Sequence, residues 1–342
     1  MQDGVGVRVG LAVAAIVACI AGSVACSGSS ADGQSGAGAP SSTTVPTGPG
    51  APFPPPSPLP DGLNLDGGPA GDGNPATFDS GIPSTPGDDP PVDPNVRTMW
   101  AVDGANQLVR FTADAPGTVT ARALTGLAAG ERVMGIDIRP ADGKLYAIGS
   151  TSRLYVVDRK TGIATPVGTT PFAPALAGIA FGLAVNPVAD KLRVHSDYDQ
   201  NLRLDPVTGS AMNDGMLAFA TGDVNGGQSP NLVASAYTNS VSPAPSATVL
   251  FAIDSTRNLL TTLANPNDGQ VSTVGDLGVD ASDVAGFDIW GGSLGKPMQA
   301  YALLMTDPTT TGLYTIELGS GAATLIGAVG TTTALRGLAV EP

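Results

Sequence analysis

The chain has 342 residues, and 16 Lys and Arg against 30 Asp and Glu give it a formal charge of −14. Phosphate binding needs clustered Lys and Arg, so this balance argues against a nucleic-acid partner. A single histidine, His195, leaves no His-based zinc site. Both cysteines, Cys19 and Cys26, lie in the first 26 residues, so the folded part has neither a disulfide nor thiolate chemistry. The composition favours an acidic, exported, β-rich protein.

Residues 1–25 predict an export signal, because Arg8 precedes an apolar run rich in small residues. Small residues then precede Cys26 and polar residues follow it, which is typical of a bacterial lipoprotein signal. We therefore expect Cys26 to be lipidated, become the new N-terminus and hold the protein to the outer face of the cytoplasmic membrane. The alternatives are lipidation of Cys19 and an ordinary cleaved signal that gives a secreted protein. A single transmembrane anchor is disfavoured, because the apolar run is at the lower limit for spanning.

Residues 26–95 follow as a segment rich in Pro, Gly, Ser and Asp that has no Lys or Arg. Such a composition buries too little apolar surface to offset the entropy of ordering. We expect this segment to be a disordered tether, with a local polyproline II stretch at 52–58, that carries a single folded domain over 96–342.

The domain sequence alternates apolar runs with turn residues, as β-strands do, and it repeats. A period of about 50 residues, with several strands in each unit, indicates the blades of a β-propeller. We predict an all-β, five-bladed propeller. The alternatives are six blades with a degenerate blade within 217–250, and a two-sheet sandwich, which the regular period disfavours. The repeated first-strand segments are 135–140 (GIDIRP), 182–187 (GLAVNP), 235–239 (SAYTN), 286–290 (GFDIW) and 337–342 (GLAVEP).

The last of these segments predicts how the ring closes. It is a first-strand segment at the C-terminus, whereas residues 98–124 begin with the later strands of a blade. We therefore expect the C-terminal strand to pair into the N-terminal blade. Such closure removes the free strand edges that invite aggregation.

Several motifs, taken in order, resemble a bacterial extracytoplasmic family catalogued as domain of unknown function 4394. The resemblance implies a propeller-like repeat fold, often in exported proteins, and supplies no activity, ligand or catalytic residue. One departure is Ala184, because the equivalent position is acidic in two other repeats, where it is Asp137 and Asp288. The motifs lie at 135–150, 153–163, 181–195, 200–210, 236–239, 267–281 and 286–289.

Asp137 and Asp288 are the main candidate site residues, because each places a carboxylate in the middle of an apolar innermost strand. Such a group is costly unless it is paired. The interpretation we favour is structural, with hydrogen bonds to backbone or arginine. The functional alternative is a ligand site on the central axis formed by Asp137, Arg139, Asp288 and Arg336, in which the two aspartates are a candidate acid–base pair.

Two weaker candidates follow from other motifs. Strand alternation places His195 on the same face as Asp197, and such a pair would suit a general base, although a satisfied polar histidine is the commoner case. Asp223 and Asn225 lie in a fragment that resembles a calcium loop, but the EF-hand glycine and glutamate are missing, so a turn is favoured. We expect no cofactor, with calcium as the alternative.

The function expected from these features is binding. We predict a monomeric, membrane-tethered binding or scaffold module for an unidentified protein, a peptide or a cell-wall component. The alternatives are an extracytoplasmic hydrolase or lyase that uses the axial carboxylates, and a purely structural envelope role. The enzyme alternative is disfavoured by the single histidine and by the lack of a nucleophile-elbow motif.

Overall fold

The structure is a computed structural model that describes residues 96–291 and 297–342. The predictions for the signal, Cys19, Cys26 and the tether lie outside these residues. Within the described ranges the elements are β-strands and one short 3₁₀ turn, Pro266–Asp268, and none is a helix that could span a membrane. The predicted all-β class is confirmed.

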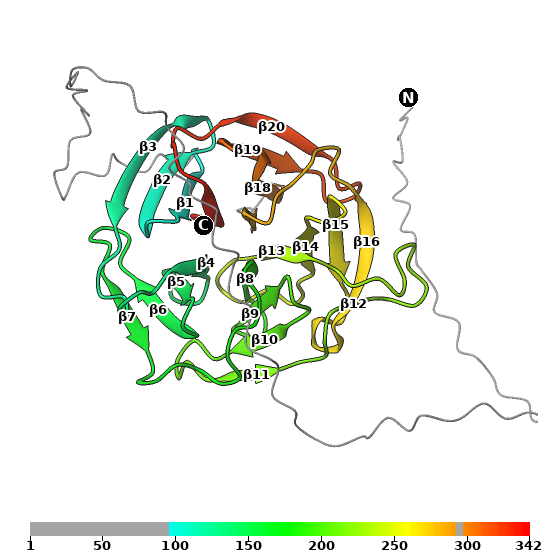
Figure 1. Ribbon diagram of the computed structural model, residues 1–342, viewed down its shortest axis with the longest axis horizontal. Coiled ribbons are helices and arrows are strands. Elements are labelled where there is room, and N and C mark those ends of the chain that lie inside the picture. Colours follow the sequence, from blue (N-terminus) through cyan, green and yellow to red (C-terminus); the bar gives the residue numbers. More distant parts are fainter. Residues whose placement is uncertain (1–95, 292–296) are drawn as a thin grey trace, which may run out of the picture. The chain divides into compact units, whose positions relative to one another are not determined.

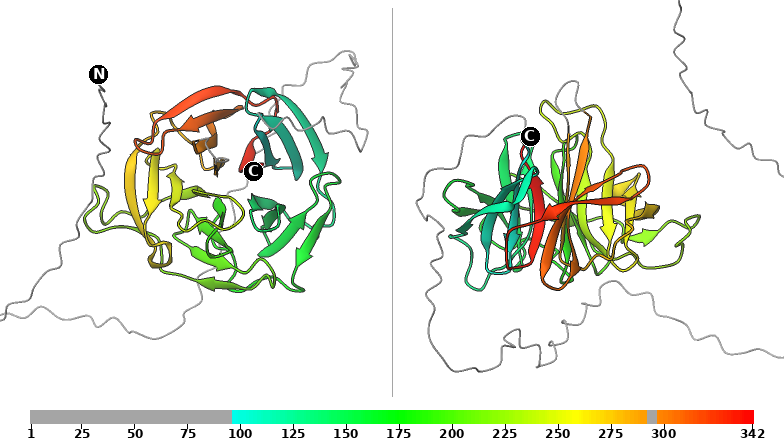
Figure 2. Two further views of the ribbon diagram at one scale, coloured as in Figure 1. Left: turned by 180° about the vertical axis from the view of Figure 1, so that it is seen from behind. Right: turned by 90° about the horizontal axis from the view of Figure 1, so that it is seen from above.

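Five small sheets, antiparallel except for one parallel pair in blade IV, stand around a central axis as the blades of a propeller (Figures 1 and 2). In each blade the first strand named below is innermost. Blade I contains β21 (Leu335–Val340), β1 (Thr98–Asp103), β2 (Gln107–Thr112) and β3 (Ala115–Ala123); blade II contains β4 (Val133–Arg139), β5 (Lys144–Gly149), β6 (Arg153–Val157) and β7 (Ala164–Val167). Blade III contains β8 (Phe181–Asn186), β9 (Lys191–Ser196), β10 (Asn201–Leu204) and β11 (Ala211–Asn213). Blade IV contains β13 (Leu232–Tyr237), β14 (Leu250–Asp254), β15 (Leu259–Leu263), β16 (Gln270–Asp276) and β12 (Ala218–Phe219); blade V contains β17 (Ala285–Trp290), β18 (Gln299–Asp307), β19 (Thr310–Ile316) and β20 (Ala323–Ala328).

The ring closes as the sequence predicts. Strand β21 follows blade V in the chain but pairs antiparallel with β1, so that Val340 lies opposite Met99 and Leu335 opposite Asp103. The stretch 217–250 does not form a sixth blade. It supplies β12, which pairs in parallel with β16 at the outer edge of blade IV, and the innermost strand β13. The five-bladed prediction is therefore confirmed.

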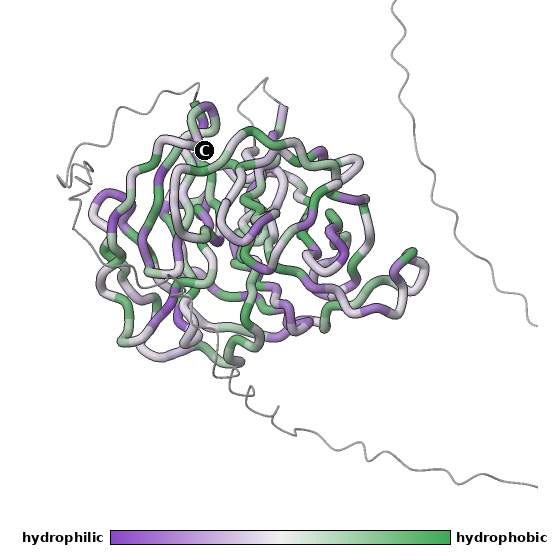
Figure 3. The backbone as a smooth tube through the Cα atoms, turned by 45° about the horizontal axis from the view of Figure 1, so that its top comes forward, coloured by the Kyte–Doolittle hydropathy of each residue, from purple (hydrophilic) through white to green (hydrophobic). Residues whose placement is uncertain are grey.

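The core lies between blades, because the innermost strands are buried on both faces. Strand β13 is buried at all six of its residues and β17 likewise. Between blades I and II, Trp100 and Ile136 belong to one apolar cluster with Tyr155. Figure 3 shows how apolar and polar residues alternate along the chain of the ring. Burial of this kind stabilises by roughly 25 cal/mol for each Å² of apolar surface removed from water.

A repeated polar contact joins successive blades. In blades I to IV the turn between the second and third strands holds one residue with positive φ, namely Asn106, Ser152, Asp199 or Asn258. Its side chain bonds to the segment just before the innermost strand of the next blade or, for Asn106, also to the first residue of that strand. We call these four contacts the inter-blade latches. Their partners are Glu131 and Val133 for Asn106, Leu176 for Ser152, Ser229 for Asp199, and Asp280 and Ala281 for Asn258.

Candidate functional site

Asp137, in the innermost strand β4, is 6% exposed and accepts two backbone hydrogen bonds. Its Oδ1 accepts from the N–H of Ile138 at 2.7 Å, and its Oδ2 accepts from the N–H of Val185 in β8 at 2.6 Å. The second bond joins the innermost strands of blades II and III. The carboxylate thus acts as a tie between blades.

Asp288, in β17, repeats this geometry at the junction of blades V and I, and it is 7% exposed. Its Oδ1 accepts from the N–H of Ile289 and its Oδ2 from the N–H of Val340 in β21, both at 2.7 Å. The residue before each inter-strand donor is alanine, Ala184 before Val185 and Ala339 before Val340. Ala184 departs from the acidic pattern at a position next to the donor that binds Asp137. An aspartate there would place a third carboxylate beside a buried one.

The two aspartates influence each other across the axis. Burial raises the pKa of Asp288 to about 7. Burial, and then the charge of Asp288, raise the pKa of Asp137 well above its usual range. Both residues line one small cavity of about 10 Å³, enough for about one water molecule. The site therefore favours a proton on the pair near neutral pH, and the cavity has no room for a substrate.

Arg139, predicted to join these aspartates, is paired elsewhere. Its Nε donates to Asp190 Oδ1 at 2.7 Å and its Nη1 to Asp142 Oδ2 at 2.8 Å. The hydrogen bonds that Arg139 donates to Asp190 raise the pKa of this guanidinium and lower the pKa of the Asp190 carboxyl. Asp190 lies in the turn before β9, so this pair is another contact between blades II and III.

His195 is fully buried in β9, and its Nδ1 lies 2.9 Å from Ser235 Oγ in β13. Burial, and then the charge of Arg193, lower the pKa of His195 to about 3, so the imidazole is neutral at physiological pH. The expected partner Asp197 instead accepts hydrogen bonds from the N–H groups of Ile179 and Ala180. The contact with Ser235 joins blades III and IV and is closed to solvent.

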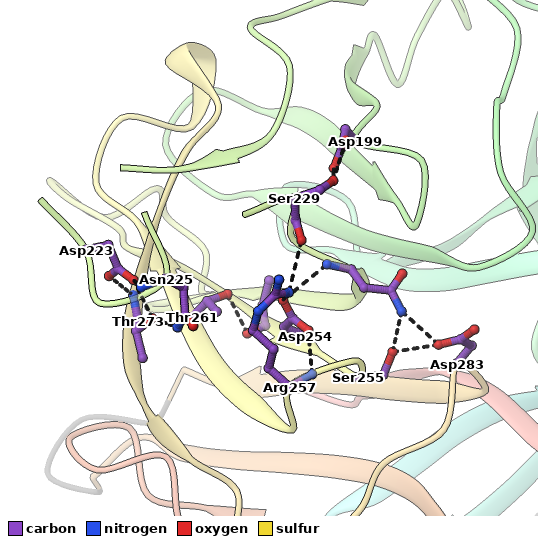
Figure 4. Close-up of polar contacts among 12 residues, drawn as sticks. Asp199, Asp223, Asn225, Ser229, Asp254, Ser255, Arg257, Thr261, Thr273 and Asp283 are labelled. Atoms are coloured by element: carbon purple, nitrogen blue, oxygen red, sulfur yellow. Dashed lines mark hydrogen bonds and ion pairs between the residues drawn. The ribbon is translucent and has the colours of Figure 1, made fainter. Parts of the chain in front are cut away.

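Asp223 and Asn225, the weak calcium candidates, hold a surface loop to blade IV (Figure 4). Asp223 accepts from the N–H of Thr273 at 2.6 Å and from the hydroxyl of Thr273 at 2.8 Å. The amide of Asn225 donates to the same hydroxyl at 2.9 Å. The part of the chain that the structure describes contains no group of three or more His, Cys, Asp or Glu placed to hold a metal.

Arg336 lies at the other end of the axis, near the start of β21. A cavity of about 110 Å³ is lined here by residues from the beginning of every innermost strand, and we call it the axial mouth. Its walls are mostly apolar, and Arg336 and Asp283 supply its charged groups. The apolar walls include Met134, Phe181, Val233 and Ala285.

The guanidinium of Arg336 lacks a counter-ion in the described structure. Its Nη1 contacts the sulfur of Met134 at 3.6 Å; among residues 96–291 and 297–342, its buried Nε has no hydrogen-bond partner and no carboxylate lies within ion-pair distance. Burial, and then the positive charge of Arg132, lower the pKa of Arg336. The negative charge of Asp103 acts in the opposite direction and raises it. The axial mouth thus holds a cation that an incoming anion would stabilise.

Of the four predicted ligand-binding residues, the structure brings Asp137 and Asp288 together and places Arg139 and Arg336 apart from them. Sequence reasoning did not single out Met134 or Asp283. The repeat contained the necessary signal, because Met134 and Asp283 lie within two residues of the start of β4 and β17, at one end of the ring. Aligning the strand starts as well as their centres would have grouped them with Arg336.

The fold and its axial sites define a five-bladed β-propeller with a mostly apolar axial mouth that holds Arg336. Comparison with protein families shows a match over residues 107–339 to "Domain of unknown function (DUF4394)". The match covers more than half of the chain, and the protein belongs to this family. No curated protein matches the sequence.

Solved structures with similar folds were also found. A nidogen/laminin complex matches with 10% identity and a TM-score of 0.41, covering 72% of this chain and 98% of the other. A protein from Lactobacillus plantarum matches with 16% identity and a TM-score of 0.37, covering 71% of each chain. A protein of unknown function from Bacteroides thetaiotaomicron matches with 13% identity and a TM-score of 0.40, covering 70% and 63%.

Proposed function

We propose that this protein is an exported, lipid-anchored binding module whose axial mouth takes the carboxylate of a small apolar group, such as the C-terminal residue of a peptide. The observation that carries the proposal is Arg336, a guanidinium in apolar surroundings without a counter-ion. Leaving a charge unpaired in such a place costs free energy. A carboxylate relieves the cost through charge-assisted, bidentate hydrogen bonds.

The size and lining of the axial mouth narrow the ligand. About 110 Å³ leaves room for a short side chain, and walls such as Val233 and Ala285 suit an apolar one. The carboxylate of Asp283, which already accepts from Asn231 and Ser255, adds negative charge at the edge of the cavity. A ligand with one carboxylate fits this balance better than a polyanion.

Calorimetry with the full-length chain in detergent tests the proposal. The ligands are short peptides that end in Ala or Val, each with a free C-terminal carboxylate or with a terminal amide. We expect binding of the carboxylate form and at least tenfold weaker binding of the amide, as charge-assisted hydrogen bonds require.

Two variants separate the site from general charge effects. Arg336→Gln should reduce the affinity for the carboxylate peptide to that for the amide, whereas Arg153→Gln removes the same charge from blade II and should leave binding unchanged. Equal binding of both peptide forms, or equal effects of the two variants, would refute the proposed site.

The envelope location is the second part of the proposal, and Cys26 supports it. We expect metabolic labelling with a fatty-acid analogue to modify the wild type and Cys19→Ser but not Cys26→Ser. Labelling that is lost only in Cys19→Ser would move the anchor to that residue, and unlabelled wild type would indicate a secreted protein.

The hydrolase or lyase alternative has no comparable support. Its two carboxylates accept backbone hydrogen bonds from adjacent innermost strands, and the cavity between them accommodates about one water molecule. We therefore keep binding as the proposed function.

A further inference from the structure

A larger cavity lies between blades III and IV, away from the axial mouth. It measures about 310 Å³, at the lower end of the range for small-molecule sites. Blade III contributes β9, β10 and the turn before β9, whereas blade IV contributes the end of β13 and the turn 265–268. We call it the inter-blade cavity.

Its inner wall includes Arg193, which is 3% exposed and held in one orientation. Nη1 donates to Asn201 Oδ1 at 2.6 Å and forms an ion pair with Asp214 at 2.5 Å, while Nη2 donates to Asn267 Oδ1 at 2.7 Å. These bonds fix the guanidinium plane. Its Nε–H is buried and has no partner in the described structure.

Tyr237 is the second buried polar side chain that lines the inter-blade cavity. It is 3% exposed and ends the innermost strand β13, and its hydroxyl has no hydrogen-bond partner in the described structure. A buried hydroxyl without a partner is costly to keep. Both unpartnered donors belong to residues that line the inter-blade cavity, and this combination indicates a place for the oxygen atoms of a ligand.

The charges around the inter-blade cavity are balanced. The ammonium of Lys191 pairs with Asp205 at 2.8 Å, and the guanidinium of Arg203 pairs with Asp214 at 2.7 Å. Asp214 also neutralises Arg193, and Asp268 adds a carboxylate at the exposed edge. No surplus positive charge remains to favour phosphate. The two unpartnered groups, the Nε–H of Arg193 and the hydroxyl of Tyr237, can both donate hydrogen bonds and therefore suit neutral oxygen acceptors.

We infer that the inter-blade cavity is a second ligand site, for a neutral polyhydroxylated molecule of monosaccharide size. The hydroxyl of Tyr237 and the Nε–H of Arg193 donate to the hydroxyl or ring oxygens of the ligand. This site goes beyond the proposed carboxylate site and does not depend on Arg336.

Saturation-transfer NMR with the full-length chain in detergent tests this inference. The neutral ligands are glucose, galactose and N-acetylglucosamine, and the anionic ones are glucuronate and inorganic phosphate. We expect at least one neutral sugar to bind, and phosphate not to compete with it. The inference is overturned if none of the neutral sugars binds or if phosphate displaces them.

Tyr237→Phe is the decisive variant, because it removes only the unpartnered hydroxyl. We expect affinity for the sugar to fall about two- to tenfold, as loss of one hydrogen bond predicts, while the protein becomes no less stable to heat. In the control Tyr155→Phe, the lost hydroxyl bonds to Glu131 at 2.9 Å in blade II, so stability should fall and sugar affinity should not change.

A second variant tests the cavity without touching its inner wall. Ala189 is exposed and lies at its edge, so Ala189→Trp should block entry and abolish sugar binding in a folded protein. Unchanged sugar binding in Tyr237→Phe or in Ala189→Trp refutes the site. Arg336→Gln serves as the cross-check: it should leave sugar binding intact even if the carboxylate proposal fails.

Discussion

The pH dependence of stability should change when the axial carboxyl of Asp288 is replaced by its neutral isostere in Asp288→Asn. Burial raises the folded-state pKa of Asp288 from 3.8 to about 7, so the folded chain holds this proton over a window where the unfolded chain releases it. The contribution to stability is fully present below pH 3.8 and is lost as pH rises through about 7.

The magnitude follows from the width of that window. Each pH unit between the two pKa values changes the contribution by about 1.4 kcal/mol, so the whole window is worth at most about 4 kcal/mol. The pKa of Asp137 is also raised, first by burial and then by the charge of Asp288. Replacing Asp288 with Asn removes the contribution of that charge to the pKa of Asp137. The stability difference between wild type and Asp288→Asn should therefore favour the wild type at pH 5 and shrink or reverse by pH 8.

Urea unfolding followed by tryptophan fluorescence measures this difference, since Trp100 and Trp290 are buried. Asp190→Asn is the matched control: its carboxyl has a lowered pKa because of Arg139, so its effect should be constant from pH 5 to 8. If the wild type and Asp288→Asn differ by the same free energy across this range, the carboxyl is not protonated in the fold and the reasoning fails.

Three further predictions concern the ring. Asn258→Ala should cost about 2 kcal/mol of unfolding free energy in urea titrations, because it removes the hydrogen bonds to Asp280 and Ala281 and places alanine at a φ of 56°; Asn258→Gly should cost less, since glycine adopts this φ freely. The pKa of His195 is lowered to about 3, so its NMR signals should not titrate from pH 8 to 5, and an inflection near 6.5 would contradict its burial. His195 also lowers the free energy of unfolding as pH falls below 6.5, because the unfolded chain then binds a proton that the buried imidazole does not bind. Removing 335–342 deletes β21 and should abolish cooperative thermal unfolding, whereas a sharp calorimetric transition in the truncated chain would show that closure is dispensable.

The blade count and ring closure were accessible from the sequence because they depend on local repetition. Each innermost strand repeats a short apolar segment at a spacing near 50 residues, and the last copy stands at the end of the chain. The sequence also indicated that Asp137 and Asp288 need partners. It did not reveal those partners, because the N–H groups of Val185 and Val340 belong to strands of neighbouring blades whose relative height no local pattern encodes.

His195 and Asp197 do not pair, for a geometric reason that the alternation of strand residues does not contain. His195 and Asp197 share a face only while the strand continues, and β9 ends at Ser196, so the chain turns before Asp197. The inter-blade cavity combines Arg193, Tyr237 and Asn267 from distant parts of the chain. In its own stretch of sequence, each of these three residues is an ordinary strand or turn residue. Only the packing of blade III against blade IV brings them together.

The axial aspartates have unequal importance because the five junctions between blades are built differently. The turns of blades I to IV carry inter-blade latches, but the corresponding turn of blade V bonds to itself, with Asp307 accepting from Thr309 and Thr310. At that junction Asp288 bonds to Val340 in β21, the strand that also closes the ring by pairing with β1. Strand β21 pairs with β1 on one side, and on the other it is held to blade V by Asp288, by the hydrogen bond from the N–H of Leu335 to the hydroxyl of Thr311, and by apolar packing. The tie made by Asp288 should accordingly matter more to ring closure than the one made by Asp137, whose junction also has the pair of Arg139 and Asp190.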